Sequence, residues 1–99
     1  MNIQSLMKQA QSMQKNIMNA KNEIESTIFE GKSELVDIKM NGKKKIVDVK
    51  INAKESLDGE DIEILQDMIM IAVNDAVDKI EKETEKKLGS QAGMLGNLF

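Results

Sequence analysis

The polar side chains on one face of the first 22 residues are the groups in this sequence best suited to recognition chemistry. If the segment is helical and Ile3 begins a heptad, this outer face carries only uncharged polar residues and lysine, at Gln4, Ser5, Lys8, Gln11, Ser12, Lys15, Asn19 and Asn22. No carboxylate precedes Glu23. Such groups contact phosphate and sugar oxygens, and glutamine can pair with an adenine edge. The pattern alone favours an ordinary solvated helix face, which commonly has this composition, and nucleic-acid contact is the alternative interpretation.

The other side chains offer little for catalysis. The 99 residues contain no cysteine, histidine, tryptophan, tyrosine, proline or arginine, which removes the usual nucleophile and base pairs and every common metal ligand except carboxylates. An acidic cluster at Asp58, Glu60, Asp61 and Glu63 lacks the alternating ligand spacing of a calcium loop and suits the start of a helix. We expect a protein that is not an enzyme and that has no metal or cofactor.

A long amphipathic helix must position the outer face. Apolar residues recur in steps of three and four along the segment, at Ile3, Leu6, Ala10, Met13, Ile17, Ala20 and Ile24. This spacing predicts a helix from about Asn2 to Ser26 that packs along another helix. At ~1.5 Å per residue it would be roughly 37 Å long. Because a domain of this size needs no helix of that length, we expect part of it to project.

Three β-prone runs follow, at Thr27–Phe29, Leu35–Met40 and Ile46–Ile51. The first is predicted to stop at Gly31. Between the last two lies Asn41-Gly42, which suits a tight hairpin because both residues tolerate positive φ. Lys43 and Lys44 leave the register of that hairpin open by two residues. The runs predict a three-stranded antiparallel sheet.

A second long helix is predicted to begin near Asp58, which can cap its free amides, and to end at about Leu88 before Gly89. Its apolar stripe comprises Ile62, Leu65, Ile69, Ala72, Ala76 and Ile80. Pairs such as Asp75 with Lys79 have the favourable order for ion pairs four residues apart. The chain is thus expected to form one α+β domain over residues 1–88, followed by a flexible glycine-rich tail over residues 89–99.

Self-association is expected from the centre of the second helix. The run 68–73 is apolar on every side of the helix, whereas one small sheet can cover only one side. A symmetric homodimer would supply the missing cover. The predicted dimer interface comprises Met68, Ile69, Ile71, Ala72 and Val73.

Three runs, Leu6–Gln14, Met40–Ile51 and Asn74–Ile80, resemble the YbaB/EbfC family of bacterial nucleoid-associated proteins, and the spacing agrees across nearly the whole chain, including the glycine-rich tail. The resemblance implies a tweezer-like homodimer whose protruding helices bind double-stranded DNA, with roles in nucleoid organisation and gene regulation. Its opening motif points to Lys8, Gln9, Gln11 and Gln14, and its later motif to Asn74, Asp75 and Lys79, of which we interpret Asn74 and Asp75 as structural residues. The remaining motif residues and the added Lys15 give the predicted DNA-binding residues, which are Lys8, Gln9, Gln11, Gln14, Lys15 and Lys79.

The composition indicates how specific and how strong the expected DNA binding is. The absence of arginine favours low sequence specificity, and the net charge of -3 favours weak, salt-dependent binding. We expect a cytoplasmic, nucleoid location, with no membrane and no small-molecule substrate as a partner. The alternative is a dimeric protein-interaction module that recruits a replication or recombination/repair protein and touches DNA only indirectly. Its contacts would be the apolar tail residues Met94, Leu95, Leu98 and Phe99.

Overall fold

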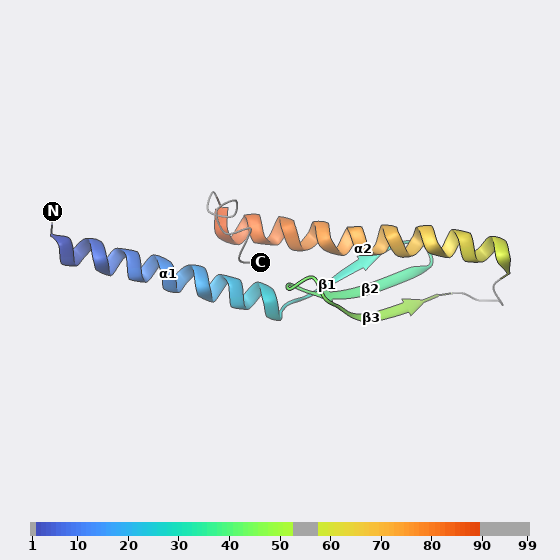
Figure 1. Ribbon diagram of the computed structural model, residues 1–99, viewed down its shortest axis with the longest axis horizontal. Helices are drawn as coiled ribbons and strands as arrows, with labels where there is room; N and C mark the ends of the chain where they lie inside the picture. Colours follow the sequence, from blue (N-terminus) through green and yellow to red (C-terminus); the bar gives the residue numbers. More distant parts are fainter. Residues whose placement is uncertain (1, 53–57, 90–99) are drawn as a thin grey trace.

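A single three-stranded sheet connects two long helices in the computed structural model, which describes residues 2–52 and 58–89. The elements follow the predicted order, as α1 (Ile3–Ser26), β1 (Ile28–Lys32), β2 (Val36–Asn41), β3 (Ile46–Ile51) and α2 (Gly59–Leu88). Helix α2 lies along the sheet and continues beside the base of α1, while the rest of α1 extends away (Figure 1). The molecule is accordingly elongated, with extents of 70 × 19 × 16 Å.

Local capping explains where both helices begin. The side chain of Asn2 accepts a hydrogen bond of 3.0 Å from the amide of Gln4. At α2 the Asp58 carboxylate accepts from the amides of Glu60 and Asp61, and the Asp61 carboxylate accepts from the amide of Asp58, which completes a capping box. The prediction of a helix start at Asp58 is confirmed, and the acidic cluster serves that start.

The hairpin between β2 and β3 is confirmed, and its register is set by two local features. The side-chain oxygen of Asn41 accepts hydrogen bonds from the amides of Lys43 and Lys45, and Lys44 takes the positive φ of 64° that closes the turn. A β-bulge then falls between Lys39 and Met40. As a result Met40 pairs with Ile46, while residues further from the turn pair in regular antiparallel order.

The core lies between β2 and α2. Alternate β2 residues, Val36, Ile38 and Met40, point to this side and are buried, as expected for a half-buried strand. They pack in two clusters with Ala72, Ala76 and Ile80 of α2. The two alanines are small enough to bring the helix axis close to the sheet.

Glycine makes this close approach possible at β1. The strand was predicted to stop at Gly31, and this prediction is wrong because β1 continues through Gly31 to Lys32. A Cβ added at Gly31 would overlap the carbonyl oxygen of Ala72 and lie 2.7 Å from the amide nitrogen of Ala76. Gly31 is therefore the contact point between β1 and α2, and it does not mark a turn.

Within the part of the chain that the structure describes, burial of α1 is confined to the half of the helix nearer its base. Ile24 is fully buried, and the hairpin turn approaches so closely that a Cβ at Gly42 would overlap the Ile24 carbonyl group. In contrast, residues 2–16 are all exposed. The prediction that part of the helix projects is confirmed, and residues 3–16 are called the arm below. No helix in the described segments is long and apolar enough to cross a membrane.

Candidate nucleic-acid interface

The arm presents a stripe of cationic and amide side chains. Gln4, Lys8, Gln11 and Lys15 follow one another at intervals of three and four residues, so they lie along one side of the helix. All four are exposed. We call these four residues the lysine stripe. Carboxylates begin only at Glu23, near the base of α1, where Lys21 and Glu25 form an ion pair of 3.6 Å. The stripe can therefore approach a polyanion without carboxylates on the arm itself.

Two of the predicted DNA-binding residues lie off this stripe. Gln9 lies on one side of the arm, where it shares a groove with Lys8. Gln14 lies on nearly the opposite side of the helix from Gln9, because five residues turn a helix by about 1.4 turns. The structure thus brings together Lys8, Gln11 and Lys15, and it separates Gln9 from Gln14.

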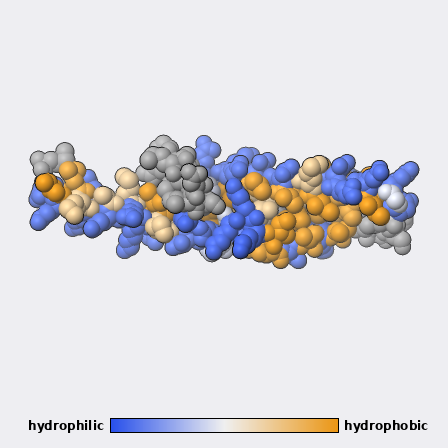
Figure 2. Space-filling model, in the orientation of Figure 1, coloured by the Kyte–Doolittle hydropathy of each residue, from blue (hydrophilic) through white to orange (hydrophobic). Residues whose placement is uncertain are grey.

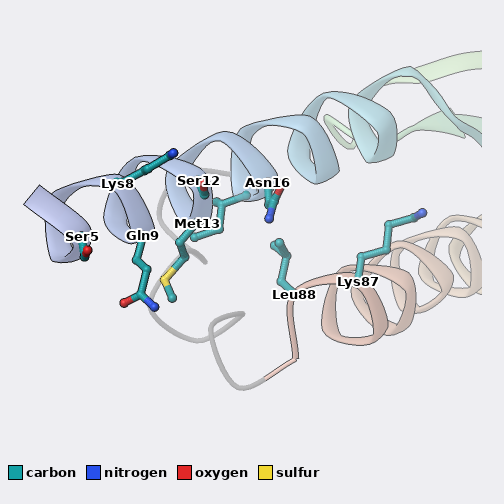
Figure 3. A pocket seen from close by; sticks show the side chains of 9 residues that line it. Ser5, Lys8, Gln9, Ser12, Met13, Asn16, Lys87 and Leu88 are labelled. Carbon is teal, nitrogen blue, oxygen red and sulfur yellow. The ribbon is translucent and has the colours of Figure 1, made fainter.

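The groove beside Lys8 lies between the arm and the end of α2. It has a volume of about 910 Å³ and is lined by Ser5, Lys8, Gln9, Ser12, Met13, Asn16, Ile17, Lys87 and Leu88. Met13 from α1 and Leu88 from α2 point toward the space between the two helices (Figure 3). Its lining combines apolar side chains with amide, hydroxyl and ammonium groups.

Lys87 is a candidate site residue that sequence reasoning missed. Its ammonium nitrogen lies 3.0 Å from a carboxylate oxygen of Glu23 and 3.8 Å from one of Glu83. The hydrogen bond with Glu23 is the main cause that raises the pKa of Lys87. This contact links the end of α2 to the base of α1. The sequence signals only the pair with Glu83, because the Glu23 contact joins residues that are distant along the chain.

Lys79 is placed elsewhere in the fold. Its ammonium group donates a hydrogen bond of 2.7 Å to the carbonyl oxygen of Glu30 and lies 3.3 Å from the Asp75 carboxylate. Asp75 in turn accepts a 2.9 Å hydrogen bond from the amide of Lys32, and this bond lowers the pKa of Asp75. Lys79 and Asp75 therefore fasten β1 to α2. Along α1, residue 8 lies roughly 27 Å from the end of the helix at residue 26. Lys79 contacts β1, which begins beyond that end, so Lys79 does not join the lysine stripe.

The lysines at the hairpin turn are also engaged within the chain. Lys43 lies 4.0 Å from Glu25, and Lys44 lies 3.8 Å from Glu81. These ion pairs are solvent-exposed and weak, but they place acidic groups beside the cationic turn. The turn therefore presents a less purely cationic surface than the arm does.

The residues predicted for a dimer interface fall into three environments. Ala72 is fully buried within the single chain, against Val36 and Ile38, so its side chain is not available to a partner. Met68 and Val73 are partly buried against the same cluster. Ile69 and Ile71 are exposed by 37% and 49%, on different sides of α2. The prediction of Ala72 as an interface residue is therefore corrected, because close packing at Gly31 places it in the core.

A larger apolar surface lies on β3. Helix α2 contacts β1 and β2 but stops short of β3 within the described residues. Side chains on the helix-facing side of β3 consequently stay about half exposed, at Ile46, Val47, Val49 and Ile51. We call these four the β3 patch. Apolar residues form a broad continuous area over the sheet half of the molecule (Figure 2). The sequence shows the alternation on this strand but does not show that α2, as far as the structure describes the chain, leaves the strand uncovered.

Comparison with known proteins agrees with this fold. Residues 1–95 match the YbaB/EbfC DNA-binding family. The nucleoid-associated protein of Lactococcus lactis subsp. cremoris (strain MG1363) is 48% identical over 90 residues, covering 90% of this chain and 91% of the relative. That of Enterococcus faecalis is 41% identical over 97 residues, covering 96% and 93%. The crystal structure of HP0035 from Helicobacter pylori aligns with a TM-score of 0.69 and 26% identity, covering 87% of this chain and 91% of HP0035. The chain belongs to the YbaB/EbfC DNA-binding family.

Proposed function

We propose that this protein is a nucleoid-associated protein that binds duplex DNA through the arm of α1. The observation that carries the proposal is the lysine stripe, which is exposed along a projecting helix that has no carboxylate before Glu23. Lys8 and Lys15 would lie against phosphates, and Gln11 would donate hydrogen bonds to the DNA backbone. Without arginine, the arm lacks the side chain best suited to bidentate recognition of guanine. Binding should therefore depend little on sequence.

The charge distribution supports this orientation on DNA. The net charge of the chain is -3, so the protein as a whole is not attracted to a polyanion. The acidic groups, however, are concentrated on α2 and at the base of α1, while the arm carries lysines alone. A duplex would be attracted to the arm and repelled by the rest of the molecule. Affinity should be modest and should fall steeply with salt.

The finer proposal is a symmetric homodimer with two arms. The β3 patch and Ile69 supply apolar surface on one side of the molecule, and β3 is an edge strand. Asp75 and Lys79 mark the side of α2 that faces β1, which places Ile69 on the side toward β3. Self-association would cover this surface. Two arms on one dimer would raise the effective affinity and could hold two segments of DNA, which suits roles in nucleoid organisation and gene regulation.

A salt titration tests DNA contact by the arm. Binding of a fluorescently labelled duplex is measured by anisotropy at several salt concentrations for the wild type and for a Lys8→Gln, Lys15→Gln variant. The variant should bind more weakly, and its log affinity should depend less steeply on log salt, by about one unit for each phosphate that a lysine no longer neutralises. The shallower dependence is the informative quantity, because it counts ionic contacts directly.

A matched control removes the same charge elsewhere. Lys39 and Lys50 lie on the outer face of the sheet, so a Lys39→Gln, Lys50→Gln variant has the same net charge but an intact arm. It should keep the wild-type salt dependence. Equal effects of both variants would mean that only net charge matters, and no saturable binding by folded wild-type protein would reject DNA binding. The latter result would favour the alternative of a module that recruits a replication or recombination/repair protein.

A further inference from the structure

The groove between the arm and α2 begins where the described part of the chain ends. Leu88, the last residue of α2, lines the groove, and Gly89 follows it with a positive φ of 56°. Residues 90–99 come next in the sequence. We propose that this C-terminal segment binds in the groove of its own chain. Binding there does not depend on whether the arm contacts DNA.

The composition of the segment matches the groove. Residues 90–99 contain no charged side chain and include four large apolar residues, Met94, Leu95, Leu98 and Phe99. The groove offers apolar contacts from Met13, Ile17 and Leu88, with uncharged polar groups such as Ser12 and Asn16 beside them. An uncharged apolar segment can fill such a space without bringing a like charge close to the flanking ammonium groups of Lys8 and Lys87.

The length of the segment is also sufficient. Ten residues in extended form reach at most roughly 33 Å. From Ile17 to Ser5 the groove follows twelve residues of α1, a distance of roughly 18 Å at ~1.5 Å per residue. The segment can therefore reach the whole groove from its attachment at Gly89. A segment attached this closely has a high effective concentration at the site, which favours its own groove over that of another molecule.

This placement would cover the part of the apolar seam of α1 that lines the groove, at Met13 and Ile17. The heptad residues of the base pack against α2 and the hairpin, whereas Met13, which lines the groove, is exposed by 54%. A seam of this kind is typical of a helix with a partner along its whole length. Because α2 ends at Leu88 beside Ile17 and Met13, the chain that follows is the nearest source of such a partner.

Disulfide trapping tests the proposal directly, because the natural sequence has no cysteine. In the first variant Leu95→Cys is combined with Asn16→Cys, which lines the groove. In the matched control Leu95→Cys is combined with Gln14→Cys, which is exposed on the other side of α1. Under mild oxidation at low protein concentration, the groove pair should form an intrachain disulfide roughly tenfold faster than the control pair. The product is identified by peptide mass after digestion.

Each other result has a definite meaning. Equal trapping rates for the two pairs would overturn the proposal, as would disulfides that join two different chains in the groove pair. A second measurement avoids the substituted groove residues. Deletion of residues 90–99 should speed amide hydrogen exchange across residues 5–16 by roughly tenfold, with little change in β2, because only the arm would lose its cover. Unchanged exchange in the arm would also reject the proposal.

The two proposals can fail separately. The salt titration of the Lys8→Gln, Lys15→Gln variant reads DNA contact without involving the segment, and disulfide trapping is carried out without DNA. Trapping in the groove together with a wild-type salt dependence in that variant would retain the docked segment and reject the DNA-binding arm. The reverse pair of results would reject only the docked segment.

Discussion

At the scale of single residues, the role of each lysine in this chain depends on which carboxylate and carbonyl groups lie beside it. Lys8 and Lys79 belong to the same residue type, yet one is exposed on a helix free of nearby carboxylates and the other donates a 2.7 Å hydrogen bond to Glu30. Sequence position alone did not separate these roles. Spacing along α1 correctly grouped Lys8, Gln11 and Lys15, whereas Gln9 and Gln14 were assigned through family resemblance and fall on different sides of the helix.

Gly31 provides the sharpest prediction at this scale. A Gly31→Ala substitution would place a methyl group against the Ala72 carbonyl and the Ala76 amide, both of which are backbone groups that cannot rotate away. We expect the free energy of unfolding to fall by about 3 kcal/mol, through overpacking and displacement of β1 from α2. Urea unfolding followed by circular dichroism measures the change. The control is Gly59→Ala, where open space predicts a neutral or slightly stabilising effect.

At the scale of elements, most of the fold could be predicted from local signals. Both helices have caps and periodic apolar faces, and the hairpin has Asn41-Gly42, so these elements were predicted close to their observed bounds. The β-bulge at Lys39, the passage of β1 through Gly31 and the contact of Lys87 with Glu23 were not predicted. Each depends on how one element packs against another that is distant in sequence. The apolar surface on β3 was not predicted for the same reason, because its exposure depends on how far α2 extends across the sheet.

The link between β1 and α2 predicts a pH dependence. Asp75 accepts hydrogen bonds from the amide of Lys32 and from Lys79, and its pKa is lowered in the folded state. A lowered carboxyl pKa means that ionised Asp75 stabilises the fold above its unfolded value of about 3.9, and that this stability is lost as the pH falls through the folded pKa. An Asp75→Asn variant should lose about 1 kcal/mol at pH 7, a modest value because the group is partly exposed.

The measurement is urea unfolding of the wild type and of Asp75→Asn from pH 7 down to pH 3. The difference between the two should stay constant to about pH 5 and shrink as the pH falls below about 4. Asp78→Asn serves as the control, since it makes the same charge change on the exposed side of α2. A difference that is the same at pH 3 and pH 7 would show that the carboxylate charge at Asp75 does not stabilise the link.

At the scale of the whole molecule, the fold separates two kinds of surface. The arm carries the lysine stripe beside scattered apolar residues such as Ile3 and Met7 at one end, while the sheet half carries the broad apolar area at the other (Figure 2). The separation follows from the offset between the helices, because α2 covers the base of α1 and two of the three strands. Partners with opposite requirements, a polyanion and an apolar surface, can therefore be bound without mutual interference. An acidic chain can present a cationic arm only if its carboxylates are kept outside the arm, as they are here.

The β3 patch predicts the oligomeric state of the protein. If two copies associate through it, sedimentation equilibrium should give twice the 11.1 kDa mass of the chain. A Val49→Lys substitution would place an unpaired charge in the buried contact and should weaken dimerisation by roughly a hundredfold or more. Val49 is 49% exposed in the single chain, so the fold itself should tolerate lysine there. Circular dichroism of the variant checks that the helices remain.

The opposite face of the same strand supplies the control for this prediction. Asp48 pairs with Lys39 and lies on the outer face of the sheet, so Asp48→Lys introduces lysine one residue away without entering the β3 patch. It should remain dimeric. A wild-type chain that sediments as a monomer, or a Val49→Lys variant that sediments as the wild type does, would exclude the β3 patch as the dimer surface. Because each dimer would present two arms, loss of dimerisation should also weaken DNA binding while each remaining arm keeps its own lysine contacts.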